Sequence, residues 1–148
     1  QVAFTDPYVL VEGVFAVPAG SAITAADDVD RPGVRVGVKE GSAYDLFLSR
    51  SLRHAELVRG AEGTAVFESA GLEVAAGIRQ PVTRWAAARG DVRVVEPRFM
   101  QIRQAVATGR ERPPEAVAWL RSAVGQLVRD GAVAAALARS GQDATVPA

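Results

Sequence analysis

Residues 34–45 read Val34-Arg35-Val36-Gly37-Val38-Lys39-Glu40-Gly41-Ser42-Ala43-Tyr44-Asp45, and the rest of the chain is organised around them. The valine-rich first part predicts a buried strand, because β-branched residues fit a pleated sheet. From Asp45 to Arg53 the apolar residues recur with the period of a helix. Residues 34–53 therefore predict a strand, a tight turn at Gly41-Ser42 and a helix.

The turn before this helix predicts a site for an anion. The N–H groups of Ser42, Ala43 and Tyr44 have no intrahelical partner and would point outward at the positive end of the helix dipole. Lys39 is the only lysine of the chain and ends the strand, where open α/β sheets bind ligands. We expect Lys39, Gly41, Ser42 and Ala43 to bind an acid group. The alternative is an exposed lysine beside an ordinary helix cap.

The composition is that of an ordinary globular domain without a charge bias. Of the 148 residues, 49% are hydrophobic and 23% charged, with 17 basic and 17 acidic side chains. No basic excess indicates nucleic acid, and the absence of cysteine excludes disulfides and thiol chemistry. No apolar run approaches the roughly 18 residues of a membrane span. Because no leader begins at Gln1, we expect a signal peptide to have been removed or to lie upstream.

Apolar patterns that alternate between strand and helix periods predict an α/β fold with a mostly parallel sheet and flanking helices. A polar stretch at residues 97–106 is expected to be an exposed extended connection, and residues from 142 onward a frayed tail. Besides the strand and helix above, the predicted strands are 2–4, 9–17, 55–59, 72–78 and 92–95, and the predicted helices are 62–70, 82–88, 113–130 and 132–139.

Five motifs occur in the order in which they stand in the second half of the family 3 solute-binding proteins of ABC transporters. Val36–Ser42 resembles the strand and the Gly-Ser/Thr turn that holds the ligand carboxylate in that family. Phe4–Tyr8 resembles the Phe-Ser-x-Pro-Tyr motif, and Asp28–Gly33 resembles Asp-Leu-x-Gly with an insertion. Ala70–Ala75 resembles Ala-Gly-x-x-Asp-Ala, and Leu127–Gly131 resembles the closing helix with its glycine. Together the motifs cover nearly the whole chain. The resemblance implies the type II periplasmic-binding fold.

The resemblance also implies a domain organisation, in which the N-terminal part of lobe 1 is missing. That part carries an arginine that usually clamps the substrate carboxylate in this family. We expect residues 1–17 to be the hinge crossing from lobe 1 and residues 18–98 to be the α/β lobe 2. Residues 99–112 would be the return crossing, and residues 113–148 the C-terminal helices of lobe 1 with a tail.

Arg79 departs from the family pattern. In amino-acid binders of the family, an Asp after the third strand accepts the α-ammonium group of the ligand. When Gly71 and Pro81 are aligned with the family, Arg79 falls at that position, and Val74 replaces another Asp. A cation there would repel an ammonium group and attract a second acid group or a carbonyl. The resemblance therefore predicts a ligand other than a typical α-amino acid, unless Arg79 simply lies in solvent at the strand end.

Three further polar residues are weaker candidates for ligand contact. Glu12 falls in the first crossing, where it faces the cleft or serves as an ion-pair partner in the hinge. Gln101 and Gln104 fall in the return crossing and either contact ligand or act as spacers. His54 is the only histidine and is expected in solvent. No cluster has the spacing of metal ligands, and no motif indicates a cofactor or a catalytic nucleophile at Ser42.

The preferred function is the substrate-binding component of an ABC importer. As the resemblance implies, it would capture a small polar, carboxylate-bearing solute between two lobes in the periplasm or another extracytoplasmic space. It would then deliver the solute to a membrane permease, with hinge closure as its mechanism. One alternative is an enzyme of the same fold, such as a dehydratase of a small carboxylic acid. Only Glu12, Glu40 or His54 would serve it as acid or base. Another is a sensory ligand-binding domain, which needs a fused output segment.

The helix expected after Pro113 carries more apolar surface than an isolated helix tolerates in water. Its stripe consists of Val117, Leu120, Val124, Leu127 and Val128. We therefore expect it to associate with the missing N-terminal lobe or with a second copy of the chain. Trp85 and Trp119 also lie on apolar helical faces and are expected in a core or an interface.

Overall fold

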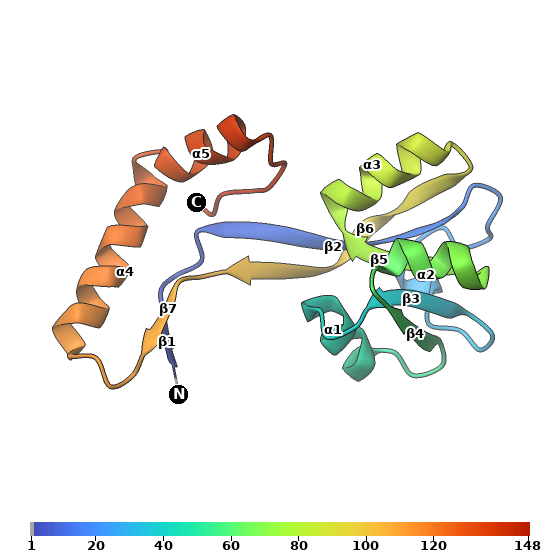
Figure 1. Cartoon of the computed structure of the whole chain (residues 1–148), viewed down its shortest axis with the longest axis horizontal. Helices are drawn as coiled ribbons and strands as arrows, with labels where there is room; N and C mark the ends of the chain where they lie inside the picture. Colours follow the sequence, from blue (N-terminus) through green and yellow to red (C-terminus); the bar gives the residue numbers. More distant parts are fainter. Residues whose placement is uncertain (1) are drawn as a thin grey trace. The chain divides into compact units, whose positions relative to one another are not determined.

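The computed structural model describes residues 2–148, and the chain divides into two compact units. One unit contains the chain up to Val11 together with Ile102–Ala148, and the other contains Glu12–Gln101 (Figure 1). The sheet unit thus extends beyond the predicted lobe 2, residues 18–98, at both ends. Residues 12–17 belong to it because Gly13–Ala16 pair with a central strand of its sheet.

A five-stranded sheet in the order β4-β3-β5-β2-β6 forms the centre of the Glu12–Gln101 unit. β3 (Arg35–Lys39) runs parallel to both of its neighbours, β4 (Glu56–Gly60) and β5 (Val74–Ile78). β2 (Val9–Pro18) pairs with β5 in the antiparallel sense, and β6 (Val92–Gln104) forms the edge. The predicted α/β class is confirmed, with parallel pairing of β3 to β4 and β5 and antiparallel pairing of β5 to β2.

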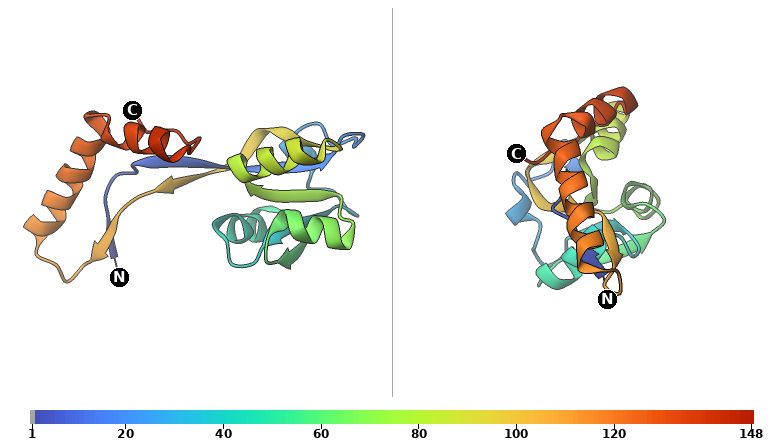
Figure 2. Two further views of the ribbon diagram at one scale, coloured as in Figure 1. Left: turned by 45° about the horizontal axis from the view of Figure 1, so that its top comes forward. Right: turned by 90° about the vertical axis from the view of Figure 1, so that its left-hand side faces the viewer.

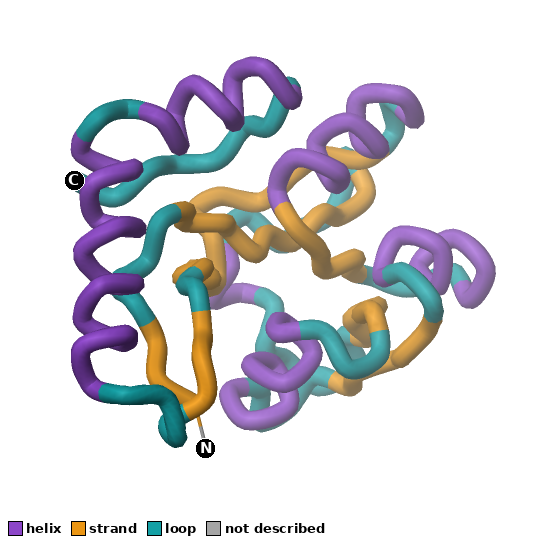
Figure 3. Tube along the Cα trace, turned by 60° about the vertical axis from the view of Figure 1, so that its left-hand side comes forward, coloured by secondary structure: helices purple, strands orange, loops and turns teal. Residues whose placement is uncertain are grey.

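Helices cover both faces of this sheet, and Figure 3 shows them in purple beside the orange strands. On one face, α1 (Ala43–Ser51) and the short 3-10 helix η1 (Ala26–Asp28) pack against a core that includes the fully buried Val36 and Val74. On the other face, α2 (Gly63–Ala70) and α3 (Arg79–Arg89) enclose a smaller core. There Trp85 packs edge-on against Phe67, with ring centroids 5.5 Å apart, so Trp85 belongs to the core as expected.

The helix ends follow the local signals in the sequence with one exception. Gly71 and Gly90 end α2 and α3 in the left-handed conformation, with φ of 58° and 76°, as glycine does at such caps. However, α3 begins at Arg79 and not at the predicted Val82. Pro81 lies in the first turn of the helix, where its missing N–H group costs no hydrogen bond. A proline fits both the end of a strand and the first turn of a helix, so Pro81 does not fix the boundary by itself.

The other unit contains a small antiparallel ribbon and two helices. β1 (Val2–Phe4), which was predicted, pairs with β7 (Ala107–Gly109). α4 (Pro114–Arg129) and α5 (Ala132–Ser140) follow each other with a sharp bend, visible in Figure 2.

The predicted extended backbone of residues 97–106 is confirmed up to Gln104 but belongs to a strand, and the predicted frayed tail is wrong. Residues 97–104 continue β6, and as an edge strand β6 accommodates Pro97 and alternating polar side chains. The tail is not frayed at Thr145, which exchanges two backbone hydrogen bonds with Leu10, at 2.7 and 3.2 Å. Such a pairing over a long sequence distance leaves no local signal.

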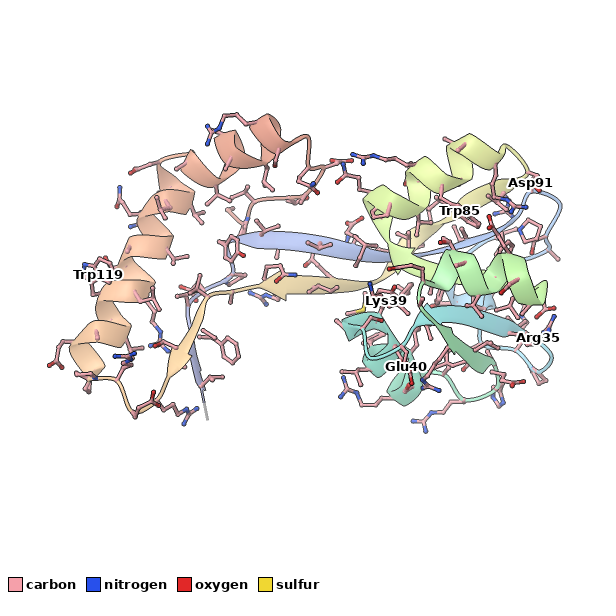
Figure 4. The ribbon with its side chains drawn as sticks, viewed as in Figure 1. Arg35, Lys39, Glu40, Trp85, Asp91 and Trp119 are labelled. Carbon is pink, nitrogen blue, oxygen red and sulfur yellow. The ribbon has the colours of Figure 1, made fainter. Side chains whose placement is uncertain are left out.

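The apolar stripe of α4 is only partly covered within its unit. Val124 is buried, whereas 51% of Leu127 and 71% of Trp119 are exposed (Figure 4). An apolar cavity of about 410 Å³ lies between Leu127 of α4 and Leu137 of α5. Association through this surface stays a prediction. Within residues 2–148, none of the helices combines the length and the apolar character needed to cross a membrane.

Candidate ligand-binding site

The parallel strands bring three helix starts to one edge of the sheet. In the register, Lys39 of β3 lies opposite Gly60 of β4, and Gly37 of β3 lies opposite Ala75 of β5. The three strands therefore end at the same edge, and each is followed by the first turn of a helix. Lys39 and Arg79 both lie at this carboxyl edge, because Lys39 ends β3 and Arg79 directly follows β5. Their role in binding stays a prediction.

A pocket of about 290 Å³ opens among these helix starts. Its walls come from the end of β3 with the first turn of α1, from the turn before α2, and from the end of β5 with the first turn of α3. Its lining residues are Lys39, Tyr44, Glu62, Gly63, Thr64, Ala76, Gly77, Ile78, Pro81 and Val82. The size is at the lower end of the range for small-molecule sites, which is about 300–1,000 Å³.

Glycine gives this pocket its shape. A Cβ atom on Gly63 would lie 2.2 Å from the carbonyl oxygen of Ala76 and 2.7 Å from that of Gly37. The start of α2 therefore rests directly on the backbones of β3 and β5, which no larger residue permits. A Cβ atom on Gly77 would lie 2.7 Å from the side chain of Val82. The pocket wall is thus built from close contacts that leave no room for a side chain at either glycine.

Lys39 shares the pocket with an acid that the sequence analysis missed. Its ammonium group donates a hydrogen bond to Oε1 of Glu62 at 2.7 Å, with side chains 51% and 56% exposed. The hydrogen bond to Glu62 raises the pKa of Lys39, and the carboxylate charge adds to the effect. Figure 4 marks Lys39 at the end of β3. Glu62 precedes α2, but its side chain does not cap the helix and is available to the pocket.

The turn before α1 uses some of the hydrogen-bond donors that were predicted to face a ligand. The N–H of Ser42 donates to the carbonyl oxygen of Lys39 at 3.2 Å, so the prediction that it points outward is wrong. The Ser42 hydroxyl accepts the N–H of Asp45, as a helix cap does. Ala43 and Tyr44 begin the helix, and the N–H groups of a first turn have no intrahelical acceptor. They remain the candidates for binding an anion here.

The buried carboxylate of Asp45 holds this turn through a hydrogen bond to its backbone. Only 3% of the residue is exposed, and burial alone would raise the pKa of its carboxyl group. Hydrogen bonds from the N–H of Gly41 and from the guanidinium of Arg59 outweigh burial and lower the pKa. Gly41 donates at 2.9 Å and has a φ of 72°, a conformation that suits glycine. Gly41 therefore serves the turn through its N–H group and its backbone conformation.

Arg79 belongs to a cluster of four charged side chains. Its guanidinium bonds to the carboxylates of Glu12 and Glu96, one Glu96 bond measuring 2.9 Å, and Arg98 donates to Glu12 at 3.1 Å. Hydrogen bonding to Glu96, more than to Glu12, raises the pKa of Arg79. Two arginines and two glutamates balance each other, so the cluster has no net charge. Of the two predicted roles of Glu12, a residue facing the cleft or an ion-pair partner, the structure shows the ion pair.

The remaining candidates lie apart from the pocket lining. Gln101 lies half-buried on β6, at the last position of the sheet unit. The carbonyl oxygen of Gln104 accepts the N–H of Tyr8 at 2.8 Å in the other unit. His54 is exposed, and its backbone N–H donates to Asp30. Among residues 2–148, no three acidic or histidine side chains gather closely enough to hold a metal ion.

Solved structures with the same arrangement include solute-binding proteins, among them a binding component of an ABC transporter. A binding component from Wolinella succinogenes DSM 1740, complexed with lysine, superimposes with a TM-score of 0.78 at 17% identity over 94% of this chain and 62% of its own. The fold is that of the ABC-transporter solute-binding proteins. The resemblance found in the sequence is thus confirmed as a common fold.

Two further solute-binding structures agree with this assignment. The solute receptor for L-cysteine of Neisseria gonorrhoeae has a TM-score of 0.73 at 19% identity, over 93% of this chain and 56% of that one. An ancestral amino-acid-binding protein, a precursor of cyclohexadienyl dehydratase, has a TM-score of 0.70 at 22% identity, over 94% and 61%. The chain therefore spans less than two thirds of the solute-binding proteins it matches. No protein-family model matches the sequence, and neither does any curated protein.

Proposed function

We propose that this chain is the sheet-bearing part of the substrate-binding component of an ABC importer. It captures a small polar, carboxylate-bearing solute outside the cytoplasm and delivers it to a membrane permease. The observation that carries the proposal is the pocket at the carboxyl edge, where Lys39 and Glu62 meet the first turn of α1 in a solute-binding fold. Ligands of open α/β sheets bind at this edge.

Lys39 is the group that attracts the carboxylate of the solute. It is more than half exposed and has one partner, so a ligand reaches it without unfolding any element. An exposed ion pair stabilises a protein little, because water screens it and the side chains lose freedom. Replacing Glu62 by a solute carboxylate as the partner of Lys39 therefore costs little folding free energy. The N–H groups of Ala43 and Tyr44, at the positive end of α1, favour the same negative group.

Glu62 gives the pocket a second specificity. When Lys39 turns to the carboxylate of the solute, Glu62 becomes free to accept a hydrogen bond from a hydroxyl, amide or cationic group of the same molecule. The positive charge of Arg79 predicted, from the sequence, a ligand other than a typical α-amino acid. Because Glu12 and Glu96 balance that charge, Arg79 adds little repulsion, and the choice of solute depends on Glu62.

The complete site requires a second lobe. The chain spans 62% of the length of the lysine-complexed neighbour, and solutes of two-lobed proteins are held by both lobes. We propose that residues before and after the sheet unit connect to that lobe as hinge crossings. Ligand contacts shared between the lobes then favour the closed state.

A binding role is preferred to an enzymatic one. The lining residues of the pocket include neither Glu40 nor His54, and Glu12 is bound to Arg79 and Arg98. The ancestral precursor of a dehydratase is itself named an amino-acid-binding protein. We therefore propose no catalytic residue and no cofactor. A sensory role would require an output segment fused to the same fold.

The proposal is tested by NMR titration of the 148-residue chain with acetate, succinate, lysine and methylamine. The acids should shift the amide signals of Ala43, Tyr44 and Thr64 in the wild type, and Lys39→Gln should remove these shifts. Arg50→Gln, on the exposed side of α1, is the matched control and should bind as the wild type does. Equal shifts in Lys39→Gln and the wild type would refute the proposed role of Lys39.

A further inference from the structure

A second cavity lies in the sheet unit, on the face that α1 covers. Its volume is about 420 Å³, and it has no lining residue in common with the pocket at the carboxyl edge. It opens between α1, the η1 segment and the edge strand β6. The covering elements leave a gap here, because one helix and one short 3-10 helix are the regular elements of this face.

Three phenylalanine rings form the apolar side of this cavity. Phe15 from β2 is 2% exposed, and its ring stacks on Phe99 from β6 with a centroid distance of 4.1 Å. Phe47 from α1 stacks on the same ring at 6.1 Å. Phe47 and Phe99 are only partly buried, so part of their ring surface stays accessible in the cavity. A flat aromatic group would complete this stack, because offset ring pairs are favourable.

The charged groups at the rim leave one carboxylate unpaired. Asp30 lines the cavity, but it accepts the backbone N–H groups of residues 53–55. Arg98 lines it too, and its guanidinium is bonded to Glu12. Asp27 also lines it, and its carboxylate has no hydrogen-bond or ion-pair partner among residues 2–148. The uncompensated charge at the rim is therefore negative.

The neighbouring acids show that Asp27 is not needed for the turn. Asp28 accepts hydrogen bonds from Thr24 and Ala25 and forms an ion pair with Arg31, and these bonds lower the pKa of its carboxyl group. Asp28 and Asp30 thus hold the loop, whereas Asp27 contributes no bond to it. An exposed acid beside accessible aromatic rings is suited to a ligand that carries a cation on an aromatic body.

We propose that this cavity binds a small aromatic amine. The ring packs against Phe47 and Phe99, and the ammonium group lies at the carboxylate of Asp27. The cavity volume lies within the usual range for small-molecule sites, which combine mostly apolar walls with a few polar groups. This site is independent of the proposed solute pocket, since the two cavities have no residue in common.

The test compares matched probes by NMR on the 148-residue chain. Phenethylamine and 3-phenylpropionate carry the same ring with opposite charge, and butylamine carries the cation without the ring. Phenethylamine should shift the signals of Phe47, Ser51 and Phe99 and leave Lys39 and Thr64 unchanged. It should bind about tenfold more tightly than 3-phenylpropionate, because one exposed charge attracts the first and repels the second. Butylamine should cause no shift in this cavity.

Two variants separate the ring from the charge. Asp27→Asn should bring phenethylamine and 3-phenylpropionate to similar affinity, whereas Phe47→Leu should weaken both. Glu56→Gln removes an exposed acid of β4 outside the cavity and should leave the preference unchanged. The proposal is overturned if phenethylamine leaves the Phe47 and Phe99 signals unshifted. It is equally overturned if Asp27→Asn keeps the full preference for the amine. Asp27 is exposed and Phe47 is partly exposed, so both variants are expected to fold as the wild type does.

Discussion

The carboxyl edge of the sheet holds two cations in contrasting surroundings. Lys39 has one acidic partner, and both side chains of that pair are more than half exposed. Arg79 has two acidic partners and is only 28% exposed, and one of its partners is tied to a second arginine. The same edge thus combines an exposed ion pair with a larger cluster whose central arginine is mostly buried.

The difference follows from the elements that carry the charges. Glu12 lies on β2 and Glu96 on β6, so Arg79 connects two strands with the first turn of α3. Glu62 lies in the turn before α2 and contacts a lysine at the end of a strand. A planar guanidinium with several fixed donors suits a cluster, whereas an ammonium group on a flexible stem suits exchange. The proposed ligand-binding role of Lys39 and the structural role of Arg79 both follow from this difference in surroundings.

The largest expected effect is the loss of the cluster. Arg79→Gln should lower the free energy of unfolding by about 1–2 kcal/mol, because it leaves the half-buried Glu12 with one arginine and removes charge-assisted bonds. Urea unfolding at pH 7 measures this change. Arg50→Gln, which replaces an exposed arginine of α1, is the matched comparison. An unchanged midpoint for Arg79→Gln would show that the cluster does not stabilise the sheet unit.

The fold was readable from the sequence because its signals are local. The valine run of β3, the Ser42 cap and the glycines at 71 and 90 each specify one element end through its own neighbours. The length of β6 was missed because an edge strand needs no clean apolar alternation. The start of α3 was missed because Pro81 fits both the end of a strand and the first turn of a helix.

The cations of the candidate site could be identified from the sequence, but their acidic partners could not, because those partners depend on pairing across the sheet. Lys39 was predicted at the end of a strand and Arg79 just after another, and parallel strands end at one edge of a sheet. Their partners were not identified, since Glu62 and Glu12 are 23 and 67 residues away in the sequence. The parallel pairing of β3 with β4 brings Glu62 to Lys39, and a single sequence does not specify that register. Arg79 was therefore interpreted as a ligand group without its balancing acids.

A smaller effect is expected in the pH dependence of the cluster. Hydrogen bonding to Arg79 lowers the pKa of Glu96 below its ordinary 4.5. A carboxyl group with a lowered pKa stabilises the fold above its ordinary value and loses that contribution as the pH falls through the folded-state pKa. The stability difference between the wild type and Arg79→Gln should therefore shrink between pH 7 and pH 3. Because Glu96 is largely exposed, the change should stay below about 1 kcal/mol.

The urea midpoints of both proteins at these two pH values measure that change. Arg50→Gln again provides the matched comparison, and its difference from the wild type should not follow the titration of Glu96. A difference for Arg79→Gln that grows toward pH 3 would contradict the sign of the argument.

The smallest expected effect is on the pair in the pocket. Lys39→Gln, Glu62→Gln and the double variant form a cycle whose coupling free energy should lie within the error of urea unfolding. The corresponding cycle of Arg79→Gln with Glu12→Gln should show a clear coupling. The reason is that solvent screens an exposed pair, whereas the side chains of Arg79 and Glu12 are only 28% and 25% exposed. A ligand replaces a partner at low cost only where that partner contributes little to the fold. A strong coupling between Lys39 and Glu62 would therefore make the pair structural, and the exchange of Glu62 for a solute carboxylate would no longer be inexpensive.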